Sequence, residues 1–265
     1  MFWLGWIVFT VVAGFTIPAI IALSLKQLLP YQQGLSVSDS ATDGRNASSS
    51  LPSISVIVPA RNEAAQIRNG LTTLLNSTGV EIEIIAVNDR STDATGRIMD
   101  ELALTESRLK VIHIVQLPEG WLGKNHAMHV ASQVATGELL LFTDGDILFE
   151  PCAIETAVRH FVHQKLQHLC LLPRMLPGSI FENAVVTFFG LAFAVGMQLH
   201  LIKTRWPLSY AGVGAFNLVD KQFYRSIGGH TPIAMDILDD VKLGKMIKNN
   251  GGTIDFQMAQ ELLSV

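Results

Sequence analysis

The apolar residues of this chain fall into short continuous runs that alternate with stretches of helical spacing. Four runs have the β-branched and large apolar composition of buried strands, at residues 53–58, 82–87, 109–115 and 138–143. Apolar residues at helical spacing lie between these runs, at residues 67–75 and 123–135. Strands that alternate with helices predict βαβ crossovers, and therefore an α/β fold with a doubly wound, mainly parallel sheet.

The rest of the chain continues the alternation less regularly. After Pro151 the pattern predicts a helix to about His163, then a strand at residues 168–172 and a last helix, headed by residues 238–244, that continues to Asn249. We expect Ser91 or Thr92 to cap the helix that follows the second strand, because hydroxyl side chains accept hydrogen bonds from exposed helical N–H groups.

The first 29 residues predict a transmembrane anchor. No charged residue precedes Lys26, and the apolar run is long enough to cross about 30 Å of hydrocarbon. A secretory signal peptide is the alternative, but the positive n-region is missing. Lys26 predicts that this end of the anchor, and the domain after it, face the cytoplasm. Residues 30–51 are rich in Ser, Gly, Asp, Thr and Asn and predict a flexible linker, leaving residues 52–265 as the main domain.

Composition supports contact with lipid, as a single-pass or monotopic protein of the cell membrane. The chain is 49% hydrophobic and 16% charged, with a mean hydropathy of +0.34. Residues 184–201 are nearly uncharged, and an interfacial or re-entrant helix and a buried core helix both fit them. A net charge of -4 argues against nucleic-acid binding, and the two cysteines, Cys152 and Cys170, offer no disulfide framework.

Polar clusters follow three of the predicted strands. They comprise Arg61–Glu63, Asn88–Asp89 and Asp144–Asp146. Ligands bind at the carboxyl ends of strands in open α/β sheets, so these clusters predict one site. Gly145 allows a tight turn that presents Asp144 and Asp146 to one hard cation, whereas the alternative is an ordinary polar turn.

These motifs resemble family 2 glycosyltransferases of the GT-A fold. The resemblance rests on Val56–Glu63, Val87–Asp93 and Thr143–Asp146, and runs from about Ile54 to the end. Residues 121–127 further resemble the subgroup associated with hopanoid and carotenoid lipids. The family implies an inverting, membrane-associated enzyme that moves a hexose from a UDP-sugar to a lipid or lipid-linked acceptor, with Mg²⁺ or Mn²⁺.

The resemblance also implies roles for single residues. Asp89 would hydrogen-bond the base, Asp144 would contact the ribose or sugar and share the metal site, and Asp146 would bind the metal on the diphosphate. The donor pocket as a whole is then expected to involve Pro59, Arg61, Glu63, Asp89, Lys124 and Asp144.

Lys124 and two histidines of the same predicted helix also have plainer interpretations. Lys124, at the start of a helix, suits a site near phosphate or sugar, but an exposed surface lysine is the alternative. His126 and His129 share one helix face, yet no third metal ligand is suggested, so we interpret them as polar positions near the cleft.

Asp239 and Asp240 begin the last predicted helix. Acids at a helix N-terminus commonly serve as caps and meet the positive end of the dipole. In the family resemblance the second acid is the general base, so we expect Asp240 to be catalytic with Asp239 supporting it. Residues 210–217 resemble the acceptor-side strand of the family, before a helix that includes residues 223–225.

Two other functions remain as alternatives. A sugar nucleotidyltransferase is disfavoured because no Gly-rich phosphate loop follows the first strand. The other alternative is a catalytically weak scaffold or a nucleotide-sugar-binding protein. It is suggested because the sequence ends at Glu261–Val265, before the position at which the family has the motif Gln-x-x-Arg-Trp. Without that motif we expect donor binding to persist while transfer falls and hydrolysis gains.

Overall fold

A computed structural model describes residue 35, residues 50–175 and 192–265, and residues 179, 185, 188 and 190. All of these belong to one compact unit, Gly34–Val265. The anchor predicted at residues 1–29 lies outside the described residues, as does most of the predicted linker. Leu35, within that linker, is buried against the core. No helix among the described residues is long and apolar enough to cross a membrane.

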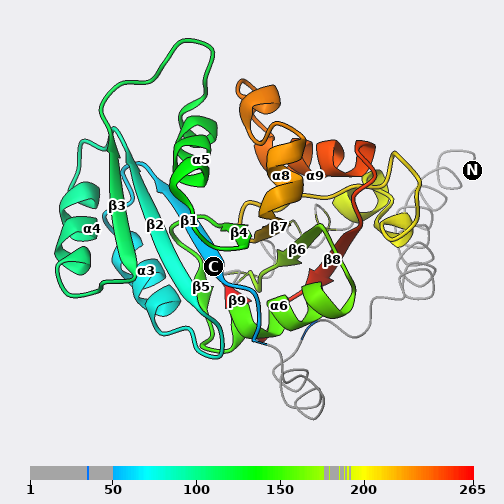
Figure 1. Ribbon diagram of the computed structural model, residues 1–265, viewed down its shortest axis with the longest axis horizontal. Coiled ribbons are helices and arrows are strands. Elements are labelled where there is room, and N and C mark those ends of the chain that lie inside the picture. Colours follow the sequence, from blue (N-terminus) through cyan, green and yellow to red (C-terminus); the bar gives the residue numbers. More distant parts are fainter. Residues whose placement is uncertain are drawn as a thin grey trace, which may run out of the picture. The chain divides into compact units, whose positions relative to one another are not determined.

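A seven-stranded sheet forms the centre of the unit, in the order β3-β2-β1-β4-β7-β6-β8 (Figure 1). Only β7 runs antiparallel to its neighbours, so the sheet is mainly parallel, as predicted. The two short remaining strands, β5 and β9, pair with each other. The strands are β1 Ile54–Ala60, β2 Ile82–Asp89, β3 Leu109–Ile114, β4 Leu139–Phe142, β5 Leu148–Phe149, β6 His168–Leu172, β7 Asn217–Asp220, β8 Ile254–Met258 and β9 Leu263–Ser264.

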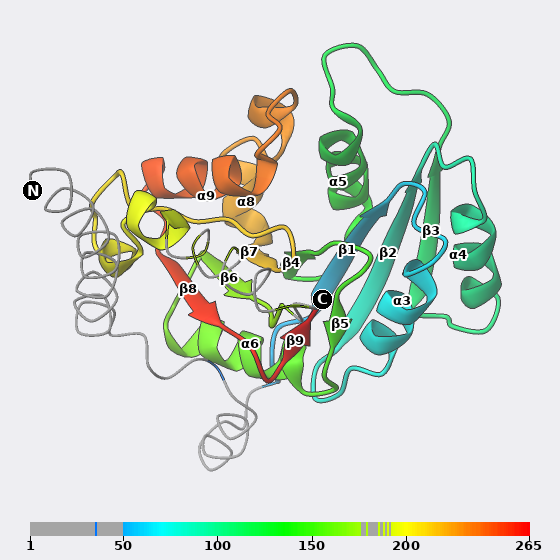
Figure 2. The same cartoon turned by 180° about the vertical axis from the view of Figure 1, so that it is seen from behind.

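Helices cover both faces of this sheet. Val56 and Ile84 point to the face where α3 and α6 pack, and α3 lies on the side that faces the viewer in Figure 2. Ile57 and Ile85 are equally buried and alternate with them, so they point to the other face, where α5 contacts β1 and β2. The helices are α3 Ile67–Leu75, α4 Thr95–Ala103, α5 Gly123–Val134, α6 Ala153–His163, α8 Lys221–Ser226 and α9 Asp239–Asn249, with short 3₁₀ turns at Leu199–Leu201 and Thr231–Ile233.

Two local predictions are wrong. Helix α4 is not capped by Ser91 or Thr92; instead Oδ1 of Asp93 accepts a hydrogen bond from the Thr95 N–H, at 2.9 Å. The stretch at residues 210–217 is a strand only from Asn217 onward, because its glycines pack backbone against backbone rather than joining the sheet.

The stretch at residues 184–201 is described only in part. Residues 192–196 are helical and a 3₁₀ turn follows at Leu199–Leu201. None of the described residues from 185 to 201 is buried within the unit, and the Val195 side chain is 50% exposed.

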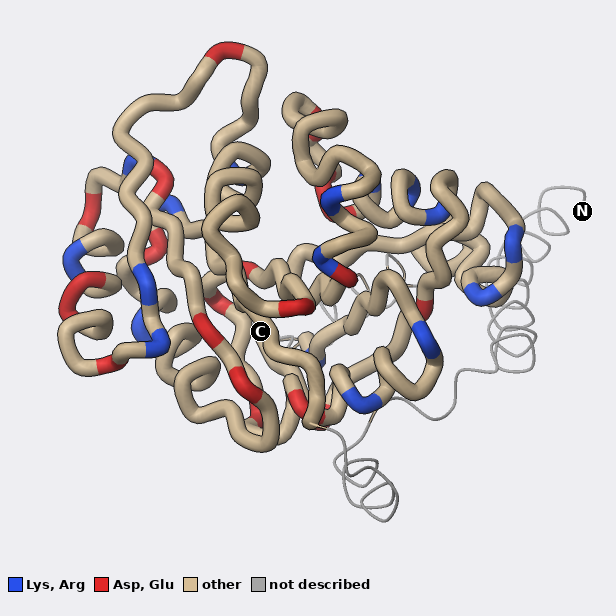
Figure 3. The backbone as a smooth tube through the Cα atoms, viewed as in Figure 1, with Lys and Arg blue, Asp and Glu red and all other residues tan. Residues whose placement is uncertain are grey.

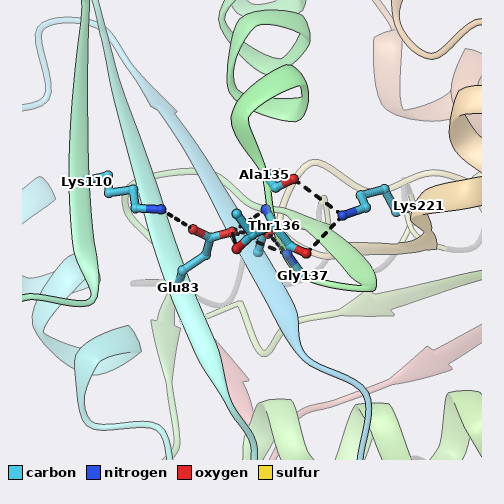
Figure 4. Close-up of polar contacts among 7 residues, drawn as sticks. Glu83, Lys110, Ala135, Thr136, Gly137 and Lys221 are labelled. Carbon is cyan, nitrogen blue, oxygen red and sulfur yellow. Dashed lines mark hydrogen bonds and ion pairs between the residues drawn. The ribbon is translucent and has the colours of Figure 1, made fainter.

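The connection between α5 and β4 is tied to the sheet by Glu83 (Figure 4). Oε1 of Glu83 accepts hydrogen bonds from the backbone N–H and the hydroxyl of Thr136, each at 2.6 Å, and from the Ser55 hydroxyl at 2.6 Å. Its Oε2 pairs with Lys110 Nζ at 2.7 Å. On the other side of the connection, Lys221 Nζ donates to the Thr136 carbonyl at 3.0 Å. These contacts fix the start of the strand that leads to Asp144.

Substituting Glu83 should therefore lower stability in a pH-dependent way. Burial would raise the pKa of Glu83, but hydrogen bonds from Lys110, Ser55 and Thr136 lower it to about 2, from an ordinary 4.5. Since the folded-state pKa is depressed, this stabilisation is present above pH 4.5 and is lost as pH falls toward 2. We expect Glu83→Gln to lower the free energy of unfolding at pH 7 by about 1–3 kcal/mol.

Urea unfolding between pH 7 and pH 3 measures this effect. Glu81→Gln, at the exposed residue just before β2, is the control. The stability difference between wild type and Glu83→Gln should shrink with acidification. A difference that stays constant with pH would contradict the role of the ionised carboxylate.

Candidate active site

The three predicted polar clusters lie at one edge of the sheet. Because β1 pairs in parallel with both β2 and β4, their carboxyl ends are neighbours. Pro59 is buried near the carboxyl end of β1, and Arg61, just after the strand, is exposed. Lys and Arg are interspersed with Asp and Glu along the described chain, so this edge is not part of a basic stripe (Figure 3).

The loops after β1 and β2 are cross-linked by hydrogen bonds. Oδ1 of Asn62 accepts from the Thr92 N–H at 2.8 Å, and the Asn62 N–H donates to Ser91 Oγ at 3.1 Å. The Glu63 N–H donates to Thr95 Oγ1 at 2.8 Å. Asn62 adopts a left-handed conformation with φ of 57°, which asparagine tolerates better than most residues. The two loops thus form one wall of the site.

Asp89 is buried at the end of β2 and is held by its neighbour. Arg90 donates from Nε and Nη2 to the two carboxylate oxygens, at 2.7 and 3.0 Å. The N-terminus of α5 lies directly against this pair, since a Cβ added at Gly123 would lie 2.1 Å from Asp89 Oδ2. Only glycine fits at residue 123, because a larger side chain would meet the Asp89 carboxylate.

Lys124 lies between Asp144 and the two acids that begin α9, Asp239 and Asp240. Its Nζ pairs with Asp144 Oδ1 at 2.6 Å. Burial lowers the pKa of Lys124, but the charges of Asp144, Asp239 and Asp240 outweigh it, so the pKa lies above its ordinary value. The structure therefore brings Lys124 to the acids and does not leave it as an isolated surface lysine.

Three carboxylates crowd around Gly145. Asp146 is exposed, whereas Glu63 Oε2 is buried and has no hydrogen-bond partner among the described residues. A Cβ added at Gly145 would lie 2.3 Å from that oxygen. Burial, and then the charges of Asp146 and Asp144, raise the pKa of Glu63 to about 7. An uncompensated buried carboxylate beside two acids is an arrangement that a cation would stabilise.

The crowded acids do not form a closed metal cage. The described part of the chain contains no group of three or more His, Cys, Asp or Glu side chains placed to hold a metal ion. Mg²⁺ and related cations are commonly held by one or two carboxylates together with substrate phosphates. Asp144 and Asp146 are therefore two carboxylates to which a bound ligand would have to add oxygen atoms before such a cation was held.

The acids of α9 differ from each other in environment. Asp239 is buried, and burial raises its pKa to about 6 in spite of the opposing charge of Lys124. Asp240 is half-buried, and its Oδ1 accepts a hydrogen bond from the Val241 N–H at 2.7 Å. Asp240 is thus the more accessible of the two carboxylates.

Asn125 is a structural residue of the site that the sequence interpretation missed. Its Nδ2 lies 2.7 Å from the Ile233 carbonyl and 2.9 Å from the Asp236 carbonyl, and its side chain is buried. These bonds tie the start of α5 to the segment that leads into Asp239. The sequence carries no signal for this role, because the bonds join residues that are more than 100 positions apart.

His126 and His129 both contact the ring of Trp121, with centroid distances of 5.6 and 4.8 Å. Burial lowers the pKa of each imidazole. Their packing agrees with the interpretation of polar helix positions near the cleft, and neither belongs to a metal-binding group among the described residues.

Comparisons with known proteins agree with this geometry. The family model described as glycosyl transferase family 2 matches residues 55–226. A 4,4'-diaponeurosporenoate glycosyltransferase of Staphylococcus aureus (strain bovine RF122 / ET3-1) is 27% identical over 194 residues, which is 72% of this chain and 50% of that protein. A relative of the same name from strain USA300 matches similarly. This chain thus spans about half the length of the curated relatives that it matches.

Solved structures share the fold. The mannosyltransferase PcManGT from Pyrobaculum calidifontis, in complex with GDP-Man and Mn²⁺, has a TM-score of 0.62 at 19% identity, covering 95% of this chain and 67% of that one. S. aureus TarS 1-349 in complex with UDP-GlcNAc has a TM-score of 0.56 at 18% identity, covering 80% of this chain and 58% of that one.

Proposed function

Because this chain belongs to glycosyl transferase family 2, we propose that it moves a hexose from a UDP-sugar to a lipid or lipid-linked acceptor, with inversion at the anomeric carbon. The observation that carries the proposal is the placement of Lys124 between Asp144 and the acids that begin α9. This placement supports a donor site and a proton acceptor that act on one reaction.

Donor binding is proposed at the edge formed by β1, β2 and β4. Pro59, Arg61 and Glu63 border the nucleotide, and Asp89 accepts a hydrogen bond from the base. Asp146 and Asp144 would hold Mg²⁺ or Mn²⁺; when bound, such a cation neutralises charge that develops on the leaving diphosphate. The Mn²⁺ and GDP-Man in the PcManGT complex support a divalent cation at this type of site.

Proton transfer is proposed at Asp240. Its carboxylate accepts the proton of the acceptor hydroxyl as that oxygen forms a bond to the anomeric carbon and the bond from that carbon to UDP breaks. Asp239 supports Asp240 from the buried side. Lys124 holds Asp144 in place and offsets the negative charge shared by the acids.

An apolar acceptor is supported by the segment before α9. Met235, Ile237 and Leu238 are 61%, 84% and 61% exposed, although Asn125 fixes the backbone that carries them. Large apolar side chains on a fixed backbone beside a proton acceptor suit a hydrocarbon chain. The S. aureus relative is named for a 4,4'-diaponeurosporenoate acceptor, which supports the same class.

Membrane attachment completes the proposal. Residues 1–29 would anchor the protein, residues 30–51 would link the anchor to the domain at residues 52–265, and the domain would face the cytoplasm, where UDP-sugars are made available to it. Flotation with liposomes compares the full chain with a version that begins at residue 31. Equal flotation of both would contradict the anchor.

A donor screen tests the proposed activity. Membranes that contain the full chain are supplied with UDP-glucose, UDP-galactose, UDP-GlcNAc or GDP-mannose, and products are identified by mass spectrometry. We expect UDP and a glycosylated lipid. Release of pyrophosphate would point to a nucleotidyltransferase, and donor binding without any product would point to a scaffold or binding protein.

A further inference from the structure

The loop from Ala211 to Phe216, here called the 211–216 loop, lies between Asp144 and the start of α9 at Asp240. On one side it packs backbone to backbone against α9. A Cβ added at Gly212 would lie 1.9 Å from the Asp240 carbonyl oxygen, and one added at Gly244 would lie 1.8 Å from the Ala211 carbonyl oxygen. No side chain fits between the loop and the helix at these points, so the loop sets how close α9 comes.

On the other side the same loop contacts the donor acids. A Cβ added at Gly214 would lie 2.6 Å from Asp144 Oδ2 and 3.3 Å from Lys124 Nζ. One residue later, the Ala215 carbonyl accepts a hydrogen bond from Thr143 Oγ1 at 2.7 Å. The loop therefore touches the Asp144 side chain and the Asp240 backbone within three residues of its own chain.

A buried polar cluster holds the loop from beneath. Asn217, the first residue of β7, donates from Nδ2 to the Val213 carbonyl at 2.8 Å. Its Oδ1 lies 3.0 Å from His168 Nε2 and 3.2 Å from Cys170 Sγ. His168 and Cys170 are fully buried and Asn217 is 3% exposed, so each polar atom depends on these partners. The cluster fixes the amide of Asn217 in one orientation.

We propose that Asn217 is a positioning residue which, through the 211–216 loop, sets the separation between Asp144 and Asp240. The proposal rests on the function proposed above, because the separation matters only if these acids serve the donor and the acceptor. Asn217 itself reaches neither acid. Its effect on turnover follows from the glycine contacts that the loop makes on its two sides.

Three substitutions separate the two sides of the loop. Gly214→Ala inserts a methyl group against the Asp144 carboxylate and should raise the donor KM by a factor on the order of ten. Gly212→Ala displaces the start of α9 and should lower kcat by a factor on the order of ten to a hundred, with a smaller effect on donor KM. Asn217→Leu should change both constants.

The matched control is Gly196→Ala, because a Cβ there meets no described atom within 4 Å. It should leave both constants at wild-type values. Hydrogen–deuterium exchange gives a readout that does not require activity. Asn217→Leu should speed amide exchange at residues 144–146 and at residues 239–241 relative to wild type, whereas a purely local role would confine the change to residues 211–217.

The outcomes distinguish this inference from the proposed function. Wild-type protein that transfers no sugar refutes the proposed function, and the exchange data still decide the coupling. Exchange changes confined to residues 211–217 overturn the inference. If Asn217→Leu fails to fold, the glycine variants decide: the split between KM and kcat supports the inference, and constants equal to those of Gly196→Ala overturn it.

Discussion

Replacing Asp240 with asparagine should lower turnover by a factor on the order of a hundred or more. The substitution keeps the size of the side chain but removes the proton acceptor, so the acceptor hydroxyl loses its route to deprotonation. Binding of UDP should stay close to wild type, because Asp240 lies on α9 and not at the strand ends proposed to hold the donor. Steady-state transfer rates together with calorimetry of UDP binding measure both effects.

Asp239→Asn is the matched comparison for Asp240→Asn. Asp239 is buried, so its carboxylate is less accessible to an acceptor hydroxyl than that of Asp240. We expect a smaller fall in turnover than for Asp240→Asn. If Asp239→Asn loses turnover and Asp240→Asn retains it, the assignment of Asp240 as the base is wrong.

Asp146→Ala should abolish metal-dependent donor binding. Asp146 is exposed beside Asp144, and the proposed cation would lose one of only two protein carboxylates. Calorimetric titration with UDP in the presence and absence of Mn²⁺ measures the loss, since only the part of the affinity that depends on Mn²⁺ should disappear.

Asp100→Ala controls for the removal of one acidic side chain, because Asp100 lies in α4 with a side chain that is 56% exposed. This variant should bind UDP and Mn²⁺ as wild type does. The metal assignment is wrong if Asp146→Ala retains the same Mn²⁺-dependent affinity.

Much of the fold could be predicted from the sequence because its signals are local. The strand at His168–Leu172 has the predicted limits, and the helix at Asp239–Asn249 ends at the predicted residue. The three polar clusters were also expected at one edge, since parallel strands bring their carboxyl ends together. Apolar periodicity and strand order therefore account for the position of the site.

What could not be predicted depends on contacts between distant residues. Asn125 bonds a carbonyl 108 residues away, and Glu83 bonds the backbone of a residue 53 positions later. The sequence predicts for Asn217 only a place at the end of a strand, yet its side chain supports the loop between Asp144 and Asp240. Such roles follow from tertiary packing and leave no periodic trace in the sequence.

We propose that one site on this chain binds a UDP-sugar through a cation and passes the sugar to a lipid. The most direct measurement supplies the full chain in membranes with sugar-labelled UDP-hexose and Mn²⁺, then follows UDP release and label in the lipid extract. We expect both UDP and labelled lipid to form, and both to be lost when Mn²⁺ is removed with chelator or Asp146 is replaced with alanine. Labelled lipid that forms equally well under those two conditions, or no labelled lipid from any UDP-hexose, would contradict it.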